Sequence, residues 1–113
     1  MFNLQEWDTA KRHNIPFVTV VADNQCWGMI KNMEKRTFKK RDAFCVDLLE
    51  GSDIVEVAKG FGCYAERVDN PDDLKNAFQR AFDAKRPALL HVPIQMVAPM
   101  GTRLAASFKN MKF

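Results

Sequence analysis

The chain has 113 residues and a net charge of +3, with 47% apolar and 27% charged residues. This length suits one domain with a modest core, and the composition is ordinary for a soluble globular chain. No apolar run approaches the roughly 20 residues of a membrane span, and the polar N-terminal segment does not resemble a signal peptide. The three cysteines are widely spaced and favour reduced thiols. We therefore expect a cytoplasmic protein with no membrane partner.

The first part of the chain predicts a helix followed by a buried strand. Asn3, with a glutamate three residues later, has the pattern of an N-cap with a capping box before a helix over 4–13. Asn14 and Pro16 are expected to end this helix, with Asn14 in a left-handed conformation. The strand covers 17–22, and its continuous apolar character is typical of a parallel strand covered on both faces.

Residues 24–50 show little periodicity. A helix can begin within 27–30, and the basic stretch 31–41 predicts an irregular, solvated excursion. Its six basic residues could attract a phosphorylated or coenzyme A substrate, but no nucleic-acid-binding module accompanies them. We expect no nucleic-acid partner.

The second half of the chain alternates clearly between helix and strand. Ser52 predicts the N-cap of a helix that ends near Gly62, and a strand over 63–68 follows. Asn70 is expected to cap the next helix, which precedes a final buried strand over 88–92. Alternation at this spacing predicts an α/β fold with parallel strands.

A polar step follows the first predicted strand, where residues 23–29 read Asp-Asn-Gln-Cys-Trp-Gly-Met. In an open α/β sheet, ligands bind at the carboxyl ends of the strands, and the oxygens of an Asp-Asn pair suit a hard cation such as Mg²⁺. By residue type alone, other interpretations stay open. Asn24 could simply cap a turn, and Trp27 and Met29 could be ordinary core side chains.

Other reactive side chains give weaker signals. No activating histidine or cation pattern stands beside Cys26, so a nucleophilic role is not favoured. His13 is expected at a helix end and His91 in a strand, and neither shows a catalytic partner. We assign no catalytic residue in this chain.

Residues 23–29 resemble the second half of the signature of thiamine diphosphate-dependent enzymes. In that family a Gly-Asp-Gly comes first, and a later strand ends in Asn-Asn or a variant, followed closely by Gly. The likeness covers about residues 2–94 and is to the C-terminal cofactor-binding domain of the acetolactate synthase and benzoylformate decarboxylase group. Trp27-Gly28-Met29 looks most like acetolactate synthase-type chains. Further segments match in register, at 12–16, 61–62, 70–71 and 86–92.

The resemblance implies thiamine diphosphate and Mg²⁺ as cofactors. By match, the metal ligands are the side chain of Asn24 and the backbone carbonyl of Cys26. Asp23 stands where the family often has a first Asn, and we assign it no metal bond. The positions that line the diphosphate and thiazolium region match Trp27, Gly28 and Met29. The glycine of this set would let the backbone approach the ligand closely.

The sequence contains no Gly-Asp-Gly, and the family's activating glutamate belongs to a separate domain. The resemblance therefore implies an N-terminally truncated fragment. We expect a partial doubly wound parallel sheet at 1–94, lacking its first strand and Gly-Asp-Gly loop, and a C-terminal tail at 95–113.

The intact enzyme would be a homo-oligomer (a dimer or tetramer) that decarboxylates a 2-keto acid and joins the product to a second keto acid. This chain alone would be inactive. The alternative is a non-catalytic remnant or interaction piece that binds no cofactor alone. A flavodoxin-like domain would fit the alternation but not residues 23–29.

Overall fold

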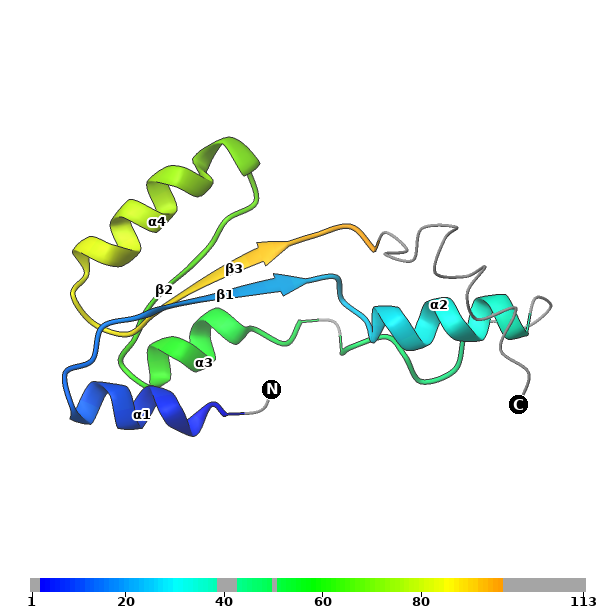
Figure 1. Cartoon of the computed structure of the whole chain (residues 1–113), viewed down its shortest axis with the longest axis horizontal. Coiled ribbons are helices and arrows are strands. Elements are labelled where there is room, and N and C mark those ends of the chain that lie inside the picture. The colour runs from blue at the N-terminus through cyan, green and yellow to red at the C-terminus, as the bar shows by residue number, and fades with distance from the viewer. Residues whose placement is uncertain (1–2, 39–42, 50, 97–113) are drawn as a thin grey trace, which may run out of the picture. The chain divides into compact units, whose positions relative to one another are not determined.

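The computed structural model describes residues 3–38, 43–49 and 51–96. The chain divides into two compact units, of which the first takes in the chain up to Asp23 together with Leu49–Ile94. Of the described residues, the second takes in those within 24–48 together with Gln95 and Met96. In chain order the elements are α1 (Gln5–Arg12), β1 (Val18–Asp23), α2 (Gly28–Thr37), α3 (Ile54–Gly60), β2 (Tyr64–Arg67), the 3₁₀ turn η1 (Pro71–Asp73), α4 (Leu74–Asp83) and β3 (Ala88–Pro93) (Figure 1).

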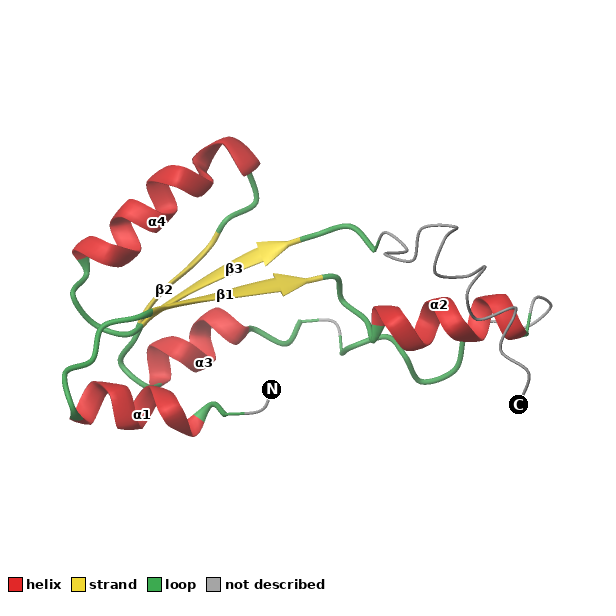
Figure 2. Cartoon of the chain, viewed as in Figure 1, coloured by secondary structure: helices red, strands yellow, loops and turns green. Residues whose placement is uncertain are grey.

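The first unit contains a three-stranded sheet in the order β1-β3-β2 (Figure 2). Both outer strands run parallel to β3, and Val18 and Tyr64 each pair with Ala88. The predicted α/β fold with parallel strands is therefore confirmed. Within the described residues, β1 pairs with β3 alone and forms one edge of the sheet.

The edge position explains one wrong prediction. Residues 17–22 were expected to be covered on both faces, but Val20 of β1 is 45% exposed. On the face of Val20 the covering helix is α4, which packs more extensively on the central strand β3 than on β1. An edge strand therefore keeps part of its apolar surface uncovered on that face.

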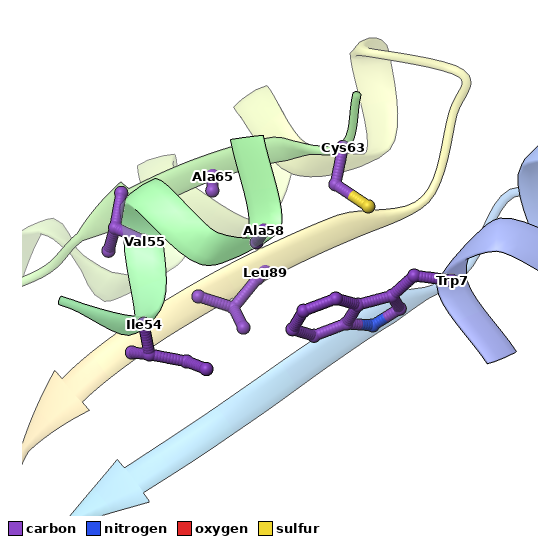
Figure 3. Packing of buried hydrophobic residues seen from close by; sticks show 7 residues of the cluster. All are labelled: Trp7, Ile54, Val55, Ala58, Cys63, Ala65 and Leu89. Carbon is purple, nitrogen blue, oxygen red and sulfur yellow. The ribbon is translucent and has the colours of Figure 1, made fainter. Parts of the chain in front are cut away.

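Helices α1 and α3 pack on one face of the sheet and bury the first hydrophobic cluster. Trp7 of α1 lies over Leu89 of β3, with Ala58 of α3 beside them (Figure 3). The indole Nε1 of Trp7 donates a hydrogen bond to Thr19 Oγ1 at 3.3 Å, so its polar atom is satisfied. This cluster holds the helix before β1 against the strand.

Helix α4 packs on the opposite face and buries the second cluster. Ala77 and Ala81 of α4 lie against Ala88 and Leu90 of β3. Leu89 and Leu90 are neighbours in sequence and point to opposite faces, and both are fully buried. Strand β3 is therefore the central strand of a three-layer α/β/α arrangement.

Two predicted helix caps are wrong. Asn3 has a left-handed φ of 71° instead of the extended conformation of an N-cap, and α1 begins after Leu4 without a side-chain cap. Ser52 does not cap α3, because Asp53 occupies that position. One carboxylate oxygen of Asp53 accepts hydrogen bonds from two backbone N–H groups, at 2.9 and 3.1 Å. A carboxylate suits the positive end of a helix better than a hydroxyl does.

Other helix ends agree with the sequence. Asn14 has a φ of 53°, as expected for the left-handed residue that ends α1. The side chain of Asn70 accepts a hydrogen bond from the backbone N–H of Asp72 at 3.0 Å, which confirms the predicted start of the last helix.

The second unit differs from the sequence-based expectation. Helix α2 runs to Thr37, so residues 31–37 of the basic stretch are helical and not irregular. Its last turn carries Lys35 and Arg36, where cations favour a helix end. Residues 39–41 of the basic stretch and 97–113 of the predicted tail lie outside the described residues.

Two general expectations can be compared with the described chain. The three cysteines Cys26, Cys45 and Cys63 form no disulfide in the described residues, and their redox state stays a prediction. None of the helices in the described ranges is long and apolar enough to cross a bilayer.

Candidate functional site

The predicted site residues come together in the segment that joins β1 to α2. Gln25 has a left-handed φ of 56°, which turns the chain sharply. The side-chain oxygen Oδ1 of Asn24 accepts a hydrogen bond from the backbone N–H of Cys26 at 3.2 Å. Asn24 therefore does cap a turn, and this bond also fixes the position of its amide oxygen.

A second segment anchors this turn. Cys26 and Asp47 form an isolated antiparallel bridge. The flanking hydrogen bonds run from the N–H of Trp27 to the carbonyl of Val46 at 2.7 Å, and from the N–H of Leu48 to the carbonyl of Gln25 at 3.0 Å. This pairing gives residues 43–49 a role that their sequence pattern did not indicate.

The backbone carbonyl of Cys26 is the second oxygen that the sequence predicted as a metal ligand. The Cys26 N–H group is used by Asn24, and no backbone N–H of residues 3–38, 43–49 or 51–96 donates to the Cys26 carbonyl. No group of three or more His, Cys, Asp or Glu side chains that could hold a metal ion occurs in the same ranges. The metal ligands available at this turn are thus two neutral oxygens. They suit a hard cation, but they fill only part of its coordination shell.

The thiol of Cys26 is buried, with the residue 9% exposed. The ammonium of Lys31, in the second turn of α2, forms an ion pair with Asp47. That hydrogen bond raises the pKa of Lys31, and the neighbouring Cys26 adds to the effect. The structure thus places a cation near Cys26 that the sequence pattern did not reveal, but a carboxylate already pairs with it.

Gly28 lies against the side chain of Asn24. A Cβ atom at position 28 would stand 2.5 Å from Asn24 Nδ2, closer than real Cβ contacts allow. The absence of a side chain at Gly28 therefore lets the amide of Asn24 occupy its place. This is a local reason for the glycine, in addition to the close ligand approach that the resemblance implies.

The N-terminus of α2 is suited to an anion. Trp27 occupies the N-cap position without a side-chain hydrogen bond, and the first turn contains no acidic residue. The first backbone N–H groups of a helix have no partner inside the helix, and the helix dipole places positive charge there. Phosphate groups commonly bind at such a terminus.

The two large side chains of the predicted site are exposed. Trp27 is 53% exposed and Met29 is 72% exposed. The alternative interpretation of both as core side chains is therefore wrong for the described chain. Exposed apolar side chains next to an open helix terminus are available to pack against a ligand.

The sequence missed one buried polar pair in the first unit. Strands β1 and β3 place the ring nitrogen Nε2 of His91 3.0 Å from Asp23 Oδ2. His91 is 4% exposed, so this contact satisfies a buried polar ring. Both residues stand near the ends of apolar strands, and their pairing depends on the strand order, which the sequence pattern does not give. His13 lies at the C-terminal end of α1, as expected.

Comparison with known proteins identifies relatives over most of the chain. The family described as "Thiamine pyrophosphate enzyme, C-terminal TPP binding domain" matches residues 1–92. A probable acetolactate synthase of Mycobacterium bovis is 33% identical over 91 residues, which are 80% of this chain and 16% of that protein. The large subunit of acetolactate synthase isozyme 2 of Escherichia coli is 31% identical over 94 residues, which are 83% of this chain and 17% of that protein.

A solved structure agrees with these relatives. The benzoylformate decarboxylase from Polynucleobacter necessarius superimposes with a TM-score of 0.75 at 26% identity, covering 88% of this chain and 19% of that one. The chain thus spans less than a fifth of each of these relatives. The family match over residues 1–92 shows that this chain belongs to the thiamine pyrophosphate enzymes, in their C-terminal TPP-binding domain.

Proposed function

We propose that this chain provides the metal-binding turn and part of the diphosphate site of a thiamine diphosphate enzyme. The observation that carries the proposal is the Asn24 turn. The hydrogen bond that Asn24 Oδ1 accepts from the Cys26 N–H fixes the Asn24 side chain in the turn that contains Cys26, directly before an uncapped helix terminus. These are the two positions that the family resemblance assigns as metal ligands.

In this proposal each residue has a defined task. Asn24 Oδ1 and the Cys26 carbonyl ligate Mg²⁺, and the N–H groups of the first turn of α2 receive the diphosphate. Trp27 and Met29 pack against the cofactor, and Gly28 leaves room for Asn24. Bound thiamine diphosphate supplies an electron sink for the decarboxylation of a 2-keto acid.

The proposal extends to the protein in which this domain acts. We assign residues 1–94 to the partial cofactor domain and 95–113 to a tail. The intact enzyme would be an acetolactate synthase-like homo-oligomer that decarboxylates 2-keto acids and joins the product to a second one. We place it in the cytoplasm, in agreement with the three unpaired thiols of the described chain.

The chain by itself should release no carbon dioxide from pyruvate. Two neutral oxygens leave the octahedral shell of Mg²⁺ incomplete, and the carboxylate of a Gly-Asp-Gly would supply the missing protein ligand. The alternative function is a non-catalytic piece of the same fold that binds no cofactor alone.

The test joins an N-terminal segment carrying a Gly-Asp-Gly strand and loop to this chain and titrates thiamine diphosphate with and without Mg²⁺. We expect magnesium-dependent binding, weakened at least about tenfold by Asn24→Ala, since changes even outside the metal ligands commonly cost about 10–100-fold. Asp23→Asn is the control, because it keeps an oxygen near His91 and should change the affinity little.

Two results would count against the proposal. Equal affinity of the parent and the Asn24→Ala protein would show that the assigned ligand is wrong. Failure of the extended chain to bind the cofactor at all would instead favour the non-catalytic alternative.

A further inference from the structure

A basic hollow of about 320 Å³ lies in the first unit, where the chain enters the three strands. We call it the basic hollow, and it is lined by Lys11, Asn14, Gly62, Lys85, Arg86 and Pro87. None of its lining residues is acidic. No part of the predicted cofactor site, residues 24–29, contributes to it.

The fold brings the lining residues together from three separate connections. Each connection leads from a helix to a parallel strand, so all three lie at the N-terminal end of the sheet, where the strands begin (Figure 1). Each contains one left-handed residue, namely Asn14 before β1, Gly62 before β2 and Lys85 before β3, with φ of 53°, 77° and 49°. The hollow is therefore a product of the fold and not of one sequence segment.

Among the described residues, the three cations of the basic hollow have no carboxylate partner. Lys11, Lys85 and Arg86 form no ion pair with any carboxylate in the described residues. Neighbouring basic residues behave differently, since Arg12 pairs with Asp8 and Lys59 pairs with Glu56.

Two further observations place Lys11 and Arg86 near the connection that leads into β2. A Cβ atom at Gly62 would collide with the Nζ of Lys11, so the ammonium lies over the backbone there. Burial raises the pKa of the neighbouring Cys63 thiol, while Lys11 and Arg86 both act against that rise. Lys11 and Arg86 therefore act on the same small region.

The simplest alternative is that these cations only balance helix dipoles. Helices α1, α3 and α4 all end beside the N-terminal ends of the strands, and each helix C-terminus carries a charge of about −0.5. Together they contribute about −1.5, against +3 from the two lysines and the arginine. The three cations exceed the charge of the helix ends by about +1.5, which complements a phosphate monoester, with about −1.5 to −2 at neutral pH.

We propose that the basic hollow binds the phosphoryl group of a small phosphorylated molecule, without a metal ion. Lys11 and Arg86 donate charge-assisted hydrogen bonds to the phosphoryl oxygens, and Lys85 adds a third cation. The volume of about 320 Å³ lies at the small end of ligand pockets, which favours a compact ligand. This site is independent of the proposed thiamine diphosphate site.

The test is an NMR titration of the ¹⁵N-labelled chain with inorganic phosphate and with ribose 5-phosphate, in EDTA and at constant ionic strength. We expect saturable shifts of the Asn14 and Gly62 amides, with ribose as an inactive control. Tighter binding of ribose 5-phosphate than of phosphate would identify an ester as the ligand, and equal binding would identify the free anion.

The variants separate a built site from general charge attraction. Lys11→Ala combined with Arg86→Ala should weaken binding at least tenfold, whereas Lys11→Arg should retain it. Lys59→Ala combined with Lys75→Ala removes the same charge from outside the basic hollow and should leave the affinity within about twofold.

Equal weakening in both double variants, or the absence of saturation, would overturn the proposal. Shifts centred on the Gly28 amide would also overturn it, because they would place the anion at α2. Asn24→Ala should leave the titration unchanged, so failure of the cofactor proposal and failure of this one are distinguishable.

Discussion

Gly28→Ala tests why a glycine stands at the start of α2. The new methyl group would lie 2.5 Å from Asn24 Nδ2, whereas ordinary contacts begin at 3.4 Å. The end of the Asn24 side chain is the part that can move, so we expect it to swing away from Cys26. This breaks the hydrogen bond from the Cys26 N–H to Asn24 Oδ1. A neutral hydrogen bond is worth about 1 kcal/mol, which corresponds to a factor of about five.

The measurement is hydrogen exchange of the Cys26 amide in the chain itself. We expect exchange about fivefold faster in Gly28→Ala, since about 1 kcal/mol of protection is lost. A melting curve would be a poor measure, because alanine also favours the helix by up to about 1 kcal/mol. Asn24→Ala should accelerate the Cys26 amide to the same degree.

The double variant gives the decisive comparison. With Asn24→Ala in place, the alanine at position 28 has no amide to displace, so it should add less than about 0.5 kcal/mol. Unchanged exchange of Cys26 in Gly28→Ala would refute the argument. Loss of cofactor affinity from Gly28→Ala even in the Asn24→Ala background would show that the glycine serves the ligand directly.

Three further predictions concern the frame around the site. Leu89→Ala should destabilise the chain by about 3 kcal/mol in a denaturant melt, because it empties a fully buried position on the central strand; a loss below about 1 kcal/mol would contradict the described core. Asp53→Ala should cost about 1 kcal/mol by removing the N-cap of α3, while Ser52→Ala should cost little; equal costs would contradict the assigned cap. Arg80 lowers the pKa of Asp73 below its ordinary value of 3.8, so their pairing stabilises the fold above that pH and the benefit is lost as the pH falls through the lowered pKa. Arg80→Met should therefore lower the melting temperature at pH 7, and the difference should shrink below about pH 4; a constant difference would exclude this linkage.

The alternation of helices and strands was readable in the sequence because it depends on local patterns. Asn14 ends α1 and Asn70 starts the last helix through contacts within a few residues, so both predictions are confirmed. The family resemblance is confirmed as well. The roles of the site residues within it stay predictions.

The helix caps at Asn3 and Ser52 show where local patterns fail. Several neighbouring residues can accept the same backbone N–H groups, and the conformation of the chain decides between them. Asp53 has the extended conformation of an N-cap, and its carboxylate accepts the N–H groups of α3, whereas the Ser52 hydroxyl donates to the Leu49 carbonyl.

Only the tertiary structure decides the contacts between residues that lie far apart in the sequence. The bridge of Cys26 to Asp47 and the contact of Asp23 with His91 each join parts of the chain that no periodicity connects. The basic hollow likewise forms only because three helix-to-strand connections meet at the N-terminal end of the sheet. The sequence by itself determined the fold class and the family, because these follow from local patterns and ordered motifs. Strand order and register determined which polar groups meet, because they set the neighbours of each side chain.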